Sequence, residues 1–340
     1  MAEQTYSEIL RQVTAGKDLS REQAQEAFSE IMDGRWTAAQ IAALLAALAA
    51  KGETVEEITG AAAAMRRHAV AIDAAGADVI DTCGTGGTGL ATFNISTAAA
   101  LVAAGAGVKV AKHGNRTHTR PSGSADVLAA MGVNIDASPA VAARCLEQAG
   151  VCFCFAVRCH PAMQHAGPVR KELGVRTIFN LLGPLTNPAG ARRQLMGVFD
   201  GALTETLAAV LGELGAVHAM VVHAADGLDE FSTTAATKVS HLIAGKITTR
   251  TYQPRDFGLA KAKLADLLVK SPQESAEVIR KILAGQKGPA RDIVVLNAAA
   301  AIVVADRAKS IKAAIPIAEQ SIDSHAAAKA LDTLITVSKG

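Results

Sequence analysis

The fold of this chain is set by residues 79–116, which read Val79-Ile-Asp-Thr-Cys-Gly84-Thr-Gly-Gly-Thr-Gly89-Leu-Ala-Thr-Phe-Asn94-Ile-Ser96-Thr97, an alanine-rich run to Ala106, Val108-Lys-Val-Ala111 and Lys112-His-Gly-Asn-Arg116. A short apolar run leads into a glycine loop (residues 84–89), then into a helix opened by Asn, Ser and Thr. A second apolar run ends in a basic loop (residues 112–116). This order predicts a strand–loop–helix–strand unit of the parallel α/β kind.

The chemistry of this stretch suits a phosphate group. Glycines permit positive φ and let the backbone approach an anion, while the N–H groups at the start of the following helix face it. Neutral hydroxyl donors come from Thr85, Thr88, Thr92, Ser96 and Thr97. Positive charge follows at Lys112 and Arg116, after the second apolar run.

Two familiar phosphate motifs fit poorly. Gly84, Gly86 and Gly89 match G-x-G-x-x-G, but a dinucleotide site needs an acidic residue after the second strand, where this chain has residues 111–113, Ala-Lys-His. A P-loop needs Lys and Ser or Thr directly after its last glycine, and residues 90–91 are Leu-Ala. The spacing therefore argues against both sites.

A third pattern covers most of the chain and comprises Gly84-Thr-Gly-Gly, Thr92-Phe-Asn-Ile-Ser-Thr97, Lys112-His-Gly-Asn-Arg116, Ser122-Gly-Ser-Ala-Asp126, Arg176-Thr-Ile-Phe-Asn-Leu-Leu-Gly-Pro-Leu-Thr-Asn-Pro188 and Asp226-Gly-Leu-Asp-Glu230. In this order, the motifs closely resemble those of the anthranilate phosphoribosyltransferases of tryptophan biosynthesis. The resemblance implies transfer of the phosphoribosyl group of phosphoribosyl pyrophosphate (PRPP) to the amine of anthranilate, with release of pyrophosphate. No covalent nucleophile is expected.

The resemblance also implies site residues. Expected PRPP contacts are Gly84, Gly87, Thr88, Thr92, Asn94, Ile95, Ser96, Thr97 and Lys112. Expected anthranilate contacts are Arg170, Asn115, His113 and Gly84, and the substrate-binding set is completed by Gly114, Arg116, Thr119, Arg120 and Ser124. Magnesium is the implied cofactor, held by Ser96 with Asp229 and Glu230 of the acidic loop (residues 226–230), since hard oxygen ligands suit Mg²⁺ bound jointly with phosphates.

Two positions depart from the family pattern. Many members carry Asp where this chain has Thr88, and a Ser-Ser-Lys run where it has Thr119-Arg120-Pro121. The first change removes a charge but keeps a backbone N–H. The second moves a positive charge by one place.

Composition indicates a globular protein without a global affinity for nucleic acid or membrane. The 340 residues are 50% hydrophobic and only 3% aromatic, with a net charge of +2. The longest apolar run, 293–305, is too short to span a bilayer, and no secretory signal opens the chain. We expect a cytoplasmic protein, and the resemblance implies a homodimer.

The five cysteines include the close group Cys152, Cys154 and Cys159. A metal site that adds His160 and His165 is one interpretation. A buried strand over 151–155 is the interpretation we favour, because the C-x₂-C pairs of a structural zinc site are lacking. Reduced cysteines fit the cytosol.

The chain is predicted to form an α/β protein of two lobes. Capping-box patterns at Ser20, Thr37 and Thr54 predict an all-helical unit over residues 1–72. Residues 73–164 and 191–340 are expected to form an α/β domain with a mostly parallel sheet. The resemblance implies that about 165–190 rejoins the helical domain, which places the active site in the cleft between lobes.

Within the α/β domain, strands are predicted over 79–81, 108–111, 151–155, 195–199, 218–222 and 239–243. Helices are predicted over 139–149, 169–173, 177–182, 202–214, 291–305 and 324–337, and a helix start at Ser271. Functional loops are expected at the carboxyl ends of the strands.

Two alternative functions remain open at this point. One is a pyrimidine nucleoside phosphorylase, which shares the two-lobe fold and a similar basic loop but uses inorganic phosphate. The other is a non-enzymatic nucleic-acid-binding protein on the same scaffold. The near-neutral charge, the few aromatics and the Asp229-Glu230 pair argue against the second.

Overall fold

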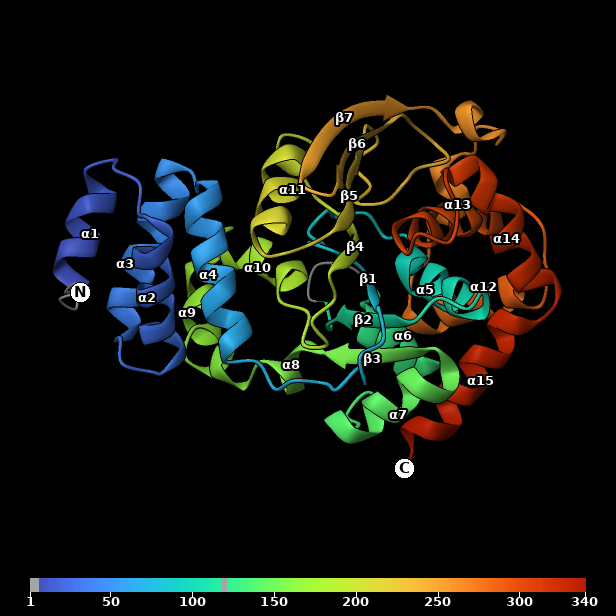
Figure 1. Ribbon diagram of the computed structural model, residues 1–340, viewed down its shortest axis with the longest axis horizontal. Coiled ribbons are helices and arrows are strands. Elements are labelled where there is room, and N and C mark those ends of the chain that lie inside the picture. The colour runs from blue at the N-terminus through green and yellow to red at the C-terminus, as the bar shows by residue number, and fades with distance from the viewer. Residues whose placement is uncertain (1–5, 118–120) are drawn as a thin grey trace.

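The computed structural model describes residues 6–117 and 121–340. Helices from the N-terminus lie at one end of the molecule, helices from the C-terminus lie at the other, and a sheet stands between them (Figure 1). None of the helices in the described ranges has both the length and the apolar composition that a membrane span requires.

Four helices form the N-terminal unit: α1 (Tyr6–Thr14), α2 (Arg21–Met32), α3 (Ala38–Lys51) and α4 (Val55–Arg67). The three capping boxes are confirmed, because the hydroxyls of Ser20, Thr37 and Thr54 each accept the backbone N–H three residues on. Each pair of reciprocal bonds satisfies N–H groups that the helix itself leaves unpaired. The local sequence alone therefore fixes where α2, α3 and α4 begin.

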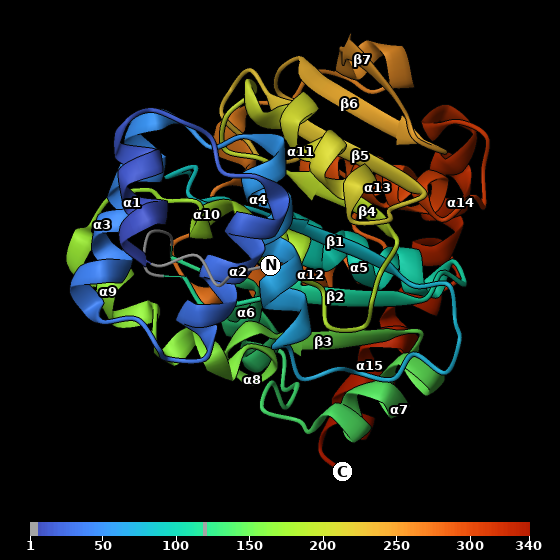
Figure 2. The same cartoon turned by 60° about the vertical axis from the view of Figure 1, so that its left-hand side comes forward.

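One sheet of seven strands has the order β3-β2-β1-β4-β5-β6-β7, visible side by side in Figure 2. Its strands are β1 (Ile80–Gly84), β2 (Val110–Gly114), β3 (Val151–Phe155), β4 (Arg193–Gly197), β5 (His218–Ala224), β6 (Thr237–Ile243) and β7 (Lys246–Tyr252). Pairing is parallel from β3 through β5 and antiparallel from β5 to β7.

All six predicted strands are present, five of them with shifted bounds, so the mostly parallel sheet is confirmed. The interpretation of 151–155 as a buried strand is also confirmed, and all five cysteines are buried and free. The seventh strand, β7, was not predicted. Its residues, Lys-Ile-Thr-Thr-Arg-Thr-Tyr, are mostly exposed, and the strand forms by hairpin pairing with β6.

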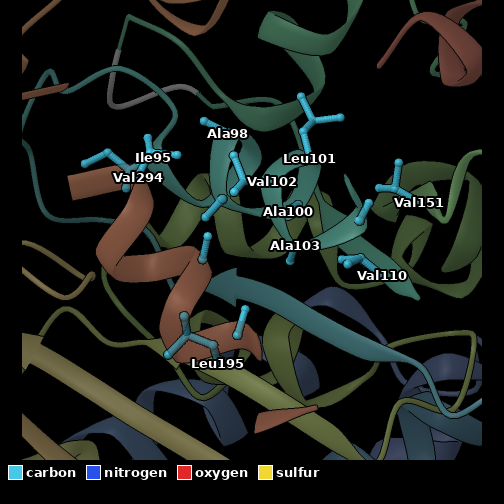
Figure 3. Close-up of a cluster of buried hydrophobic side chains, with 14 of the residues drawn as sticks. Ile95, Ala98, Ala100, Leu101, Val102, Ala103, Val110, Val151, Leu195 and Val294 are labelled. Atoms are coloured by element: carbon cyan, nitrogen blue, oxygen red, sulfur yellow. The ribbon is translucent and has the colours of Figure 1, made fainter. Parts of the chain in front are cut away.

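Helix α5 (Ile95–Gly105) is enclosed between the sheet and the C-terminal helices. Figure 3 shows its side chains among Val110 of β2, Val151 of β3, Leu195 of β4 and Val294 of α13. Because five of its eleven residues are alanine, neighbouring elements approach its backbone closely. The C-terminal helices are α12 (Pro272–Leu283), α13 (Pro289–Val304), α14 (Ile311–Asp323) and α15 (Ala326–Ser338).

The other connections are short helices. They are α6 (Ser124–Ala130), α7 (Pro139–Ala149), α8 (Ala156–Cys159), α9 (Gly167–Leu173), α10 (Phe179–Leu185) and α11 (Leu203–Glu213), with 3₁₀ turns at Pro161–Gln164, Pro254–Phe257 and Leu264–Leu267. Ser271 caps α12 as predicted, because its hydroxyl accepts from the Glu274 N–H.

Residues 165–190 contact the N-terminal helices. The ring of Phe179 in α10 lies 5.5 Å from that of Phe28 in α2, and apolar side chains of α9 and α10 share a buried cluster with α2, α3 and α4. Arg66 of α4 donates from Nε to the Leu185 carbonyl, at 2.7 Å, and from Nη1 to the Leu214 carbonyl, at 3.0 Å. The same arginine thus caps the ends of both α10 and α11.

Helix α4 packs against α2 through Gly60, and this contact generates a stability prediction. A Cβ on Gly60 would lie 2.3 Å from the Arg21 carbonyl oxygen, so Gly60→Ala should lower the free energy of unfolding by about 1–3 kcal/mol. Gly212 is a matched helical control, because its Cβ would meet only Leu242, at 3.6 Å. Gly212→Ala should be neutral or stabilising by up to about 1 kcal/mol. Urea unfolding of both variants measures the difference, and equal effects would contradict the close α2–α4 contact.

Candidate active site

The predicted loops meet at one edge of the sheet. The glycine loop follows β1, the basic loop begins in β2, and the acidic loop follows β5. Parallel strands bring their carboxyl ends to the same edge, which is where ligands bind in open α/β sheets. The structure therefore joins segments that are more than a hundred residues apart in sequence.

The acidic loop packs directly on the ends of two neighbouring strands. A Cβ on Gly84 of β1 would lie 2.5 Å from Asp229 Oδ2, and one on Gly197 of β4 would lie 1.7 Å from the Asp229 carbonyl oxygen. Asp229 Oδ2 accepts the Gly86 N–H at 3.1 Å. Glycine is therefore required at both strand ends, because any side chain there would displace Asp229.

Helix α5 begins against the second acidic residue. Ser96 donates its N–H to Glu230 Oε1 at 3.1 Å, and its hydroxyl accepts from Lys112 Nζ, also at 3.1 Å. One side chain of the acidic loop thus contacts the glycine loop and the next contacts the helix start. The two carboxylates and the hydroxyl form an oxygen donor set of the kind that Mg²⁺ prefers.

No group of three or more His, Cys, Asp or Glu side chains is placed to hold a metal ion anywhere in residues 6–117 and 121–340. The predicted magnesium set differs from such a group, because its third member is the hydroxyl of Ser96. The residues of this set fit a hard cation by their donor chemistry.

Lys112 is buried between β1 and the start of α5, with 3% of its surface exposed. Its Nζ also donates to the Thr82 carbonyl. Burial lowers the pKa of Lys112, while the nearby Asp81 carboxylate, followed by Glu230 and Asp229 among other groups, acts to raise it. The ammonium group thus donates to two oxygens, one from β1 and one from the start of α5.

Asp81 of β1 was not predicted as a site residue, yet it is fully buried beneath the basic loop. Its carboxylate accepts the His113 N–H at 3.0 Å and the Asn187 Nδ2 at 2.7 Å. Burial raises the pKa of Asp81, and these bonds and the charge of Lys112 oppose the shift. A charged residue inside an apolar strand was the sequence signal that could have found it.

Asn94 precedes α5 and uses its side chain inside the protein. Its Oδ1 accepts the hydroxyls of Ser122, at 2.6 Å, and Ser275, at 2.8 Å, and its Nδ2 donates to the Ser122 carbonyl. Its own N–H donates to Ser275 Oγ. Asn94 therefore joins three segments, and sequence reasoning missed both serine partners.

The other predicted residues near α5 are differently placed. Thr97 is 1% exposed and its Oγ1 has no hydrogen-bond partner among the described residues, which leaves a buried hydroxyl unsatisfied at the helix start. Ile95 points into the core, which leaves only its backbone for a ligand. Thr92 is buried where the chain pairs with Leu268. Thr88 accepts the Leu90 N–H on its hydroxyl at 3.3 Å.

The basic loop combines a buried histidine with exposed polar groups. His113 donates from Nδ1 to the Gly183 carbonyl at 2.9 Å, so its Nε2 accepts from Nε2 of His160, 3.2 Å away. Gly114 is required by Ser124, whose Oγ would lie 2.2 Å from an added Cβ. Asn115 and Arg116 of the same loop are exposed. The Asn115 carbonyl accepts from the Ser124 hydroxyl, and Arg116 forms an ion pair with Asp126 at 2.8 Å.

Thr119 and Arg120 lie outside the described residues. Arg170 lies on α9, half-buried, with its guanidinium 5.2 Å from the ring centre of Phe179. Burial lowers its pKa. No ion pair links Arg170 to any carboxylate in the part of the chain that the structure describes.

Comparison with known proteins identifies the family. The model of a glycosyl transferase family helical bundle domain matches residues 7–69, and that of a glycosyl transferase family a/b domain matches residues 76–328. Anthranilate phosphoribosyltransferases from Symbiobacterium thermophilum and Moorella thermoacetica are 51% and 52% identical to this chain, over 96% of both chains in each case. The chain belongs to the anthranilate phosphoribosyltransferase family.

Solved anthranilate phosphoribosyltransferases have the same fold. That of Thermus thermophilus superposes with a TM-score of 0.93 and 39% identity, covering 98% of this chain and 99% of the other. The Saccharomyces cerevisiae enzyme in complex with PRPP and Mg superposes with a TM-score of 0.89 and 27% identity, over 99% of both chains. The predicted family and the two-part helical and α/β fold are therefore confirmed.

The histidine pair of this anthranilate phosphoribosyltransferase family member gives a pH prediction. Burial lowers the pKa of His113 to about 3, with a further contribution from His160, and burial lowers that of His160 to about 4. Both values lie below the ordinary value of about 6.5, so the unfolded chain binds more protons in this window. The free energy of unfolding should therefore fall by about 1.5 kcal/mol per ring between pH 6.5 and pH 5.

His160→Gln tests this prediction, because the amide can still donate to His113 while it no longer titrates. Its unfolding free energy, measured in urea at several pH values, should depend less on pH than that of the wild-type protein. His325→Asn is the control at an exposed histidine with φ of 62°, which asparagine tolerates. An unchanged pH dependence in His160→Gln would refute the assignment.

Proposed function

We propose that this protein transfers the phosphoribosyl group of PRPP to the amine of anthranilate, giving N-(5-phosphoribosyl)anthranilate and pyrophosphate, in L-tryptophan biosynthesis. The observation that carries the proposal is the convergence of the glycine, basic and acidic loops at one sheet edge, in a chain about half identical to named relatives over nearly its full length. In the reaction a C–N bond forms at C1 of the ribose, the bond to pyrophosphate breaks, and the amine loses a proton.

The binding site for PRPP is inferred from the unpaired hydrogen-bonding groups at the start of α5. We assign the pyrophosphate and ribose of PRPP to the glycine loop and the helix start, with Gly84, Gly87 and Thr88 contributing backbone. The buried Thr97 hydroxyl has no partner within residues 6–117 and 121–340, which supports a polar ligand at this position. Asn94 holds the helix start in place through Ser122 and Ser275, rather than offering a free amide.

Ser96, Asp229 and Glu230 are the residues that would hold Mg²⁺. Bound Mg²⁺ neutralises charge on a leaving pyrophosphate. The carboxylates also have a role of their own, since they accept N–H groups of the glycine loop and of α5 and so fix both relative to Lys112. Lys112 adds a compact positive charge beside the donor site.

The acceptor is assigned to Arg170, with Asn115 and His113 of the basic loop and Gly84 at the end of β1. A guanidinium fork matches a carboxylate in two hydrogen bonds, and Arg170 forms no ion pair with the described residues. Because α9 and α10 pack against the N-terminal helices, we infer that residues 165–190 belong with residues 1–72 in a discontinuous helical domain. The acceptor then approaches from the helical side and the donor from the sheet.

We also propose a cytoplasmic homodimer, on the strength of the family resemblance. Sedimentation equilibrium would measure the mass, and a monomer at micromolar concentration would refute the dimer.

The reaction itself is tested by following the loss of anthranilate fluorescence with PRPP and Mg²⁺. Thymidine with inorganic phosphate serves as the parallel assay for a nucleoside phosphorylase. Consumption of anthranilate with equimolar pyrophosphate release supports the proposal. Thymine production without anthranilate turnover would replace it with the phosphorylase function.

Removing both carboxylates of the acidic loop should abolish most activity. Asp229→Asn with Glu230→Gln should lower turnover by about a hundredfold or more, on the scale of losing an electrostatic contact to a transition state. The matched control is Glu277→Gln with Asp332→Asn, which removes the same two charges from exposed helix positions. Pyrophosphate release and thermal unfolding are measured for both. Near-normal turnover of the folded loop variant would contradict the magnesium assignment.

Arg170 should select the acceptor by its carboxylate. Arg170→Ala should raise the KM for anthranilate about ten- to a thousandfold, because an ion pair excluded from water is worth a few kcal/mol. The KM for PRPP should change far less. Arg170→Lys should recover part of the loss, since an ammonium lacks the planar fork.

Arg144→Ala is the control for Arg170, because Arg144 is exposed on α7. Steady-state kinetics with each substrate varied separately would decide the matter. An equal rise of the KM for anthranilate and the KM for PRPP in Arg170→Ala would show that the arginine stabilises the fold and that the acceptor binds elsewhere.

A further inference from the structure

Arg176 is a second arginine that contacts the site, and neither the predicted contacts nor the proposed reaction uses it. It lies between α9, which carries Arg170, and α10. Its Nη2 donates to the Gly87 carbonyl of the glycine loop at 2.7 Å, across a sequence separation of 89 residues. This is a direct bond from the segment of the acceptor arginine to the loop assigned to the donor.

An aromatic ring fixes the position of this guanidinium. The Arg176 Cζ lies 3.9 Å from the ring centre of Phe199, a distance at which cation–π attraction is effective. Phe199 is itself tied to the start of the glycine loop, because its N–H donates to Thr85 Oγ1 at 3.0 Å. The Thr85 N–H in turn donates to the Gly197 carbonyl at the end of β4. The Phe199 ring that contacts Arg176 is therefore held in a fixed position relative to the sheet.

The bond to Gly87 determines the direction of a neighbouring N–H. The Gly87 carbonyl and the Thr88 N–H belong to one planar trans peptide, in which they point in opposite directions. Holding the carbonyl toward Arg176 therefore turns the Thr88 N–H away from it. Among the described residues, this N–H donates to no other group.

Without Arg176 this peptide would turn easily. Gly86 and Gly87 have φ of 64° and 75°, values that side-chain-bearing residues rarely adopt. Because Gly87 has no Cβ, rotation of the peptide that follows it meets little steric resistance. A single strong bond to its carbonyl, from a charged donor, is then what selects one orientation.

We propose that Arg176 is a positioning residue that sets the orientation of the Gly87–Thr88 peptide, so that the Thr88 N–H is presented to the pyrophosphate of PRPP. This inference rests on the proposed function, because it takes the glycine loop as the pyrophosphate site. Arg176 affects PRPP binding through the Gly87–Thr88 peptide and does not itself contact the substrate. It thereby links the segment that carries the acceptor arginine to the loop that binds the donor.

Substitutions at Arg176 separate this role from a direct charge contact. Arg176→Ala should raise the KM for PRPP about tenfold or more, the range for loss of a charge-assisted hydrogen bond, with kcat and the KM for anthranilate much less affected. Arg176→Gln should recover a substantial part of the loss, because its neutral amide can still donate to the Gly87 carbonyl. A direct charge contact with PRPP would instead leave Arg176→Gln as weak as Arg176→Ala, and this result would overturn the proposal.

Arg192→Ala is the matched control. Arg192 is also exposed and also donates to a backbone carbonyl, that of Gly215 at 2.9 Å, but it precedes the first residue of β4, at the opposite end of the strand from the site. Its substitution should leave both KM values unchanged. Equal effects of Arg192→Ala and Arg176→Ala, or a change of less than twofold in the KM for PRPP in Arg176→Ala, would refute the positioning role.

Calorimetry with pyrophosphate and Mg²⁺ tests the inference apart from the reaction. Wild-type protein should bind pyrophosphate more tightly than Arg176→Ala by a factor similar to the change in KM, and Arg176→Gln should be intermediate. If the wild-type protein binds pyrophosphate but does not consume anthranilate, the proposed reaction fails while the positioning role stands. If it consumes anthranilate and Arg176→Ala binds pyrophosphate as tightly as the wild type, the positioning role fails alone.

Discussion

The contact between Asp229 and the ends of β1 and β4 is the constraint on which the site depends. Gly84 and Gly197 are opposite each other in the parallel register, and neither position has room for a side chain beneath Asp229. The acidic loop can therefore settle onto the sheet and accept the Gly86 N–H. Because both strand ends lack a side chain, the carboxylate of Asp229, in the loop after β5, can reach the loop after β1.

The same contact organises the charges around it. Glu230 follows Asp229 and accepts the Ser96 N–H, while the Ser96 hydroxyl accepts from Lys112. Lys112 is buried near Asp81, which in turn accepts the N–H of His113. Buried charges are stable only with partners, so each group limits where the next can lie. The glycine, basic and acidic loops are in this way parts of one polar network.

Local features of the fold were predictable from sequence. The hydroxyls at Ser20, Thr37 and Thr54 bond within three residues, so the sequence pattern contains the whole interaction. Strand β7 was missed because its residues carry little apolar alternation and it forms only by pairing with β6. Features that depend on a partner elsewhere in the fold leave no local pattern.

The candidate site likewise divides into features that the sequence predicted and features that it did not. The family motifs located the loops, and the structure brings them to one edge. The motifs did not reveal that the amide of Asn94 is held by Ser122 and Ser275, nor that Asp81 lies beneath the basic loop, because these contacts join distant segments.

The bond between Asn94 and Ser275 has a consequence for synthesis of the chain, since it spans 181 residues. A ribosome releases the glycine loop and α5 long before it has made α12, and contacts of such long separation form late in folding. A nascent chain that ends before Ser275 carries the glycine loop and α5 without one of the two serines that hold Asn94 at the helix start. The helix start to which we assign PRPP is therefore completed only when α12 has been made, so truncated products of this protein should not sequester PRPP in the cell.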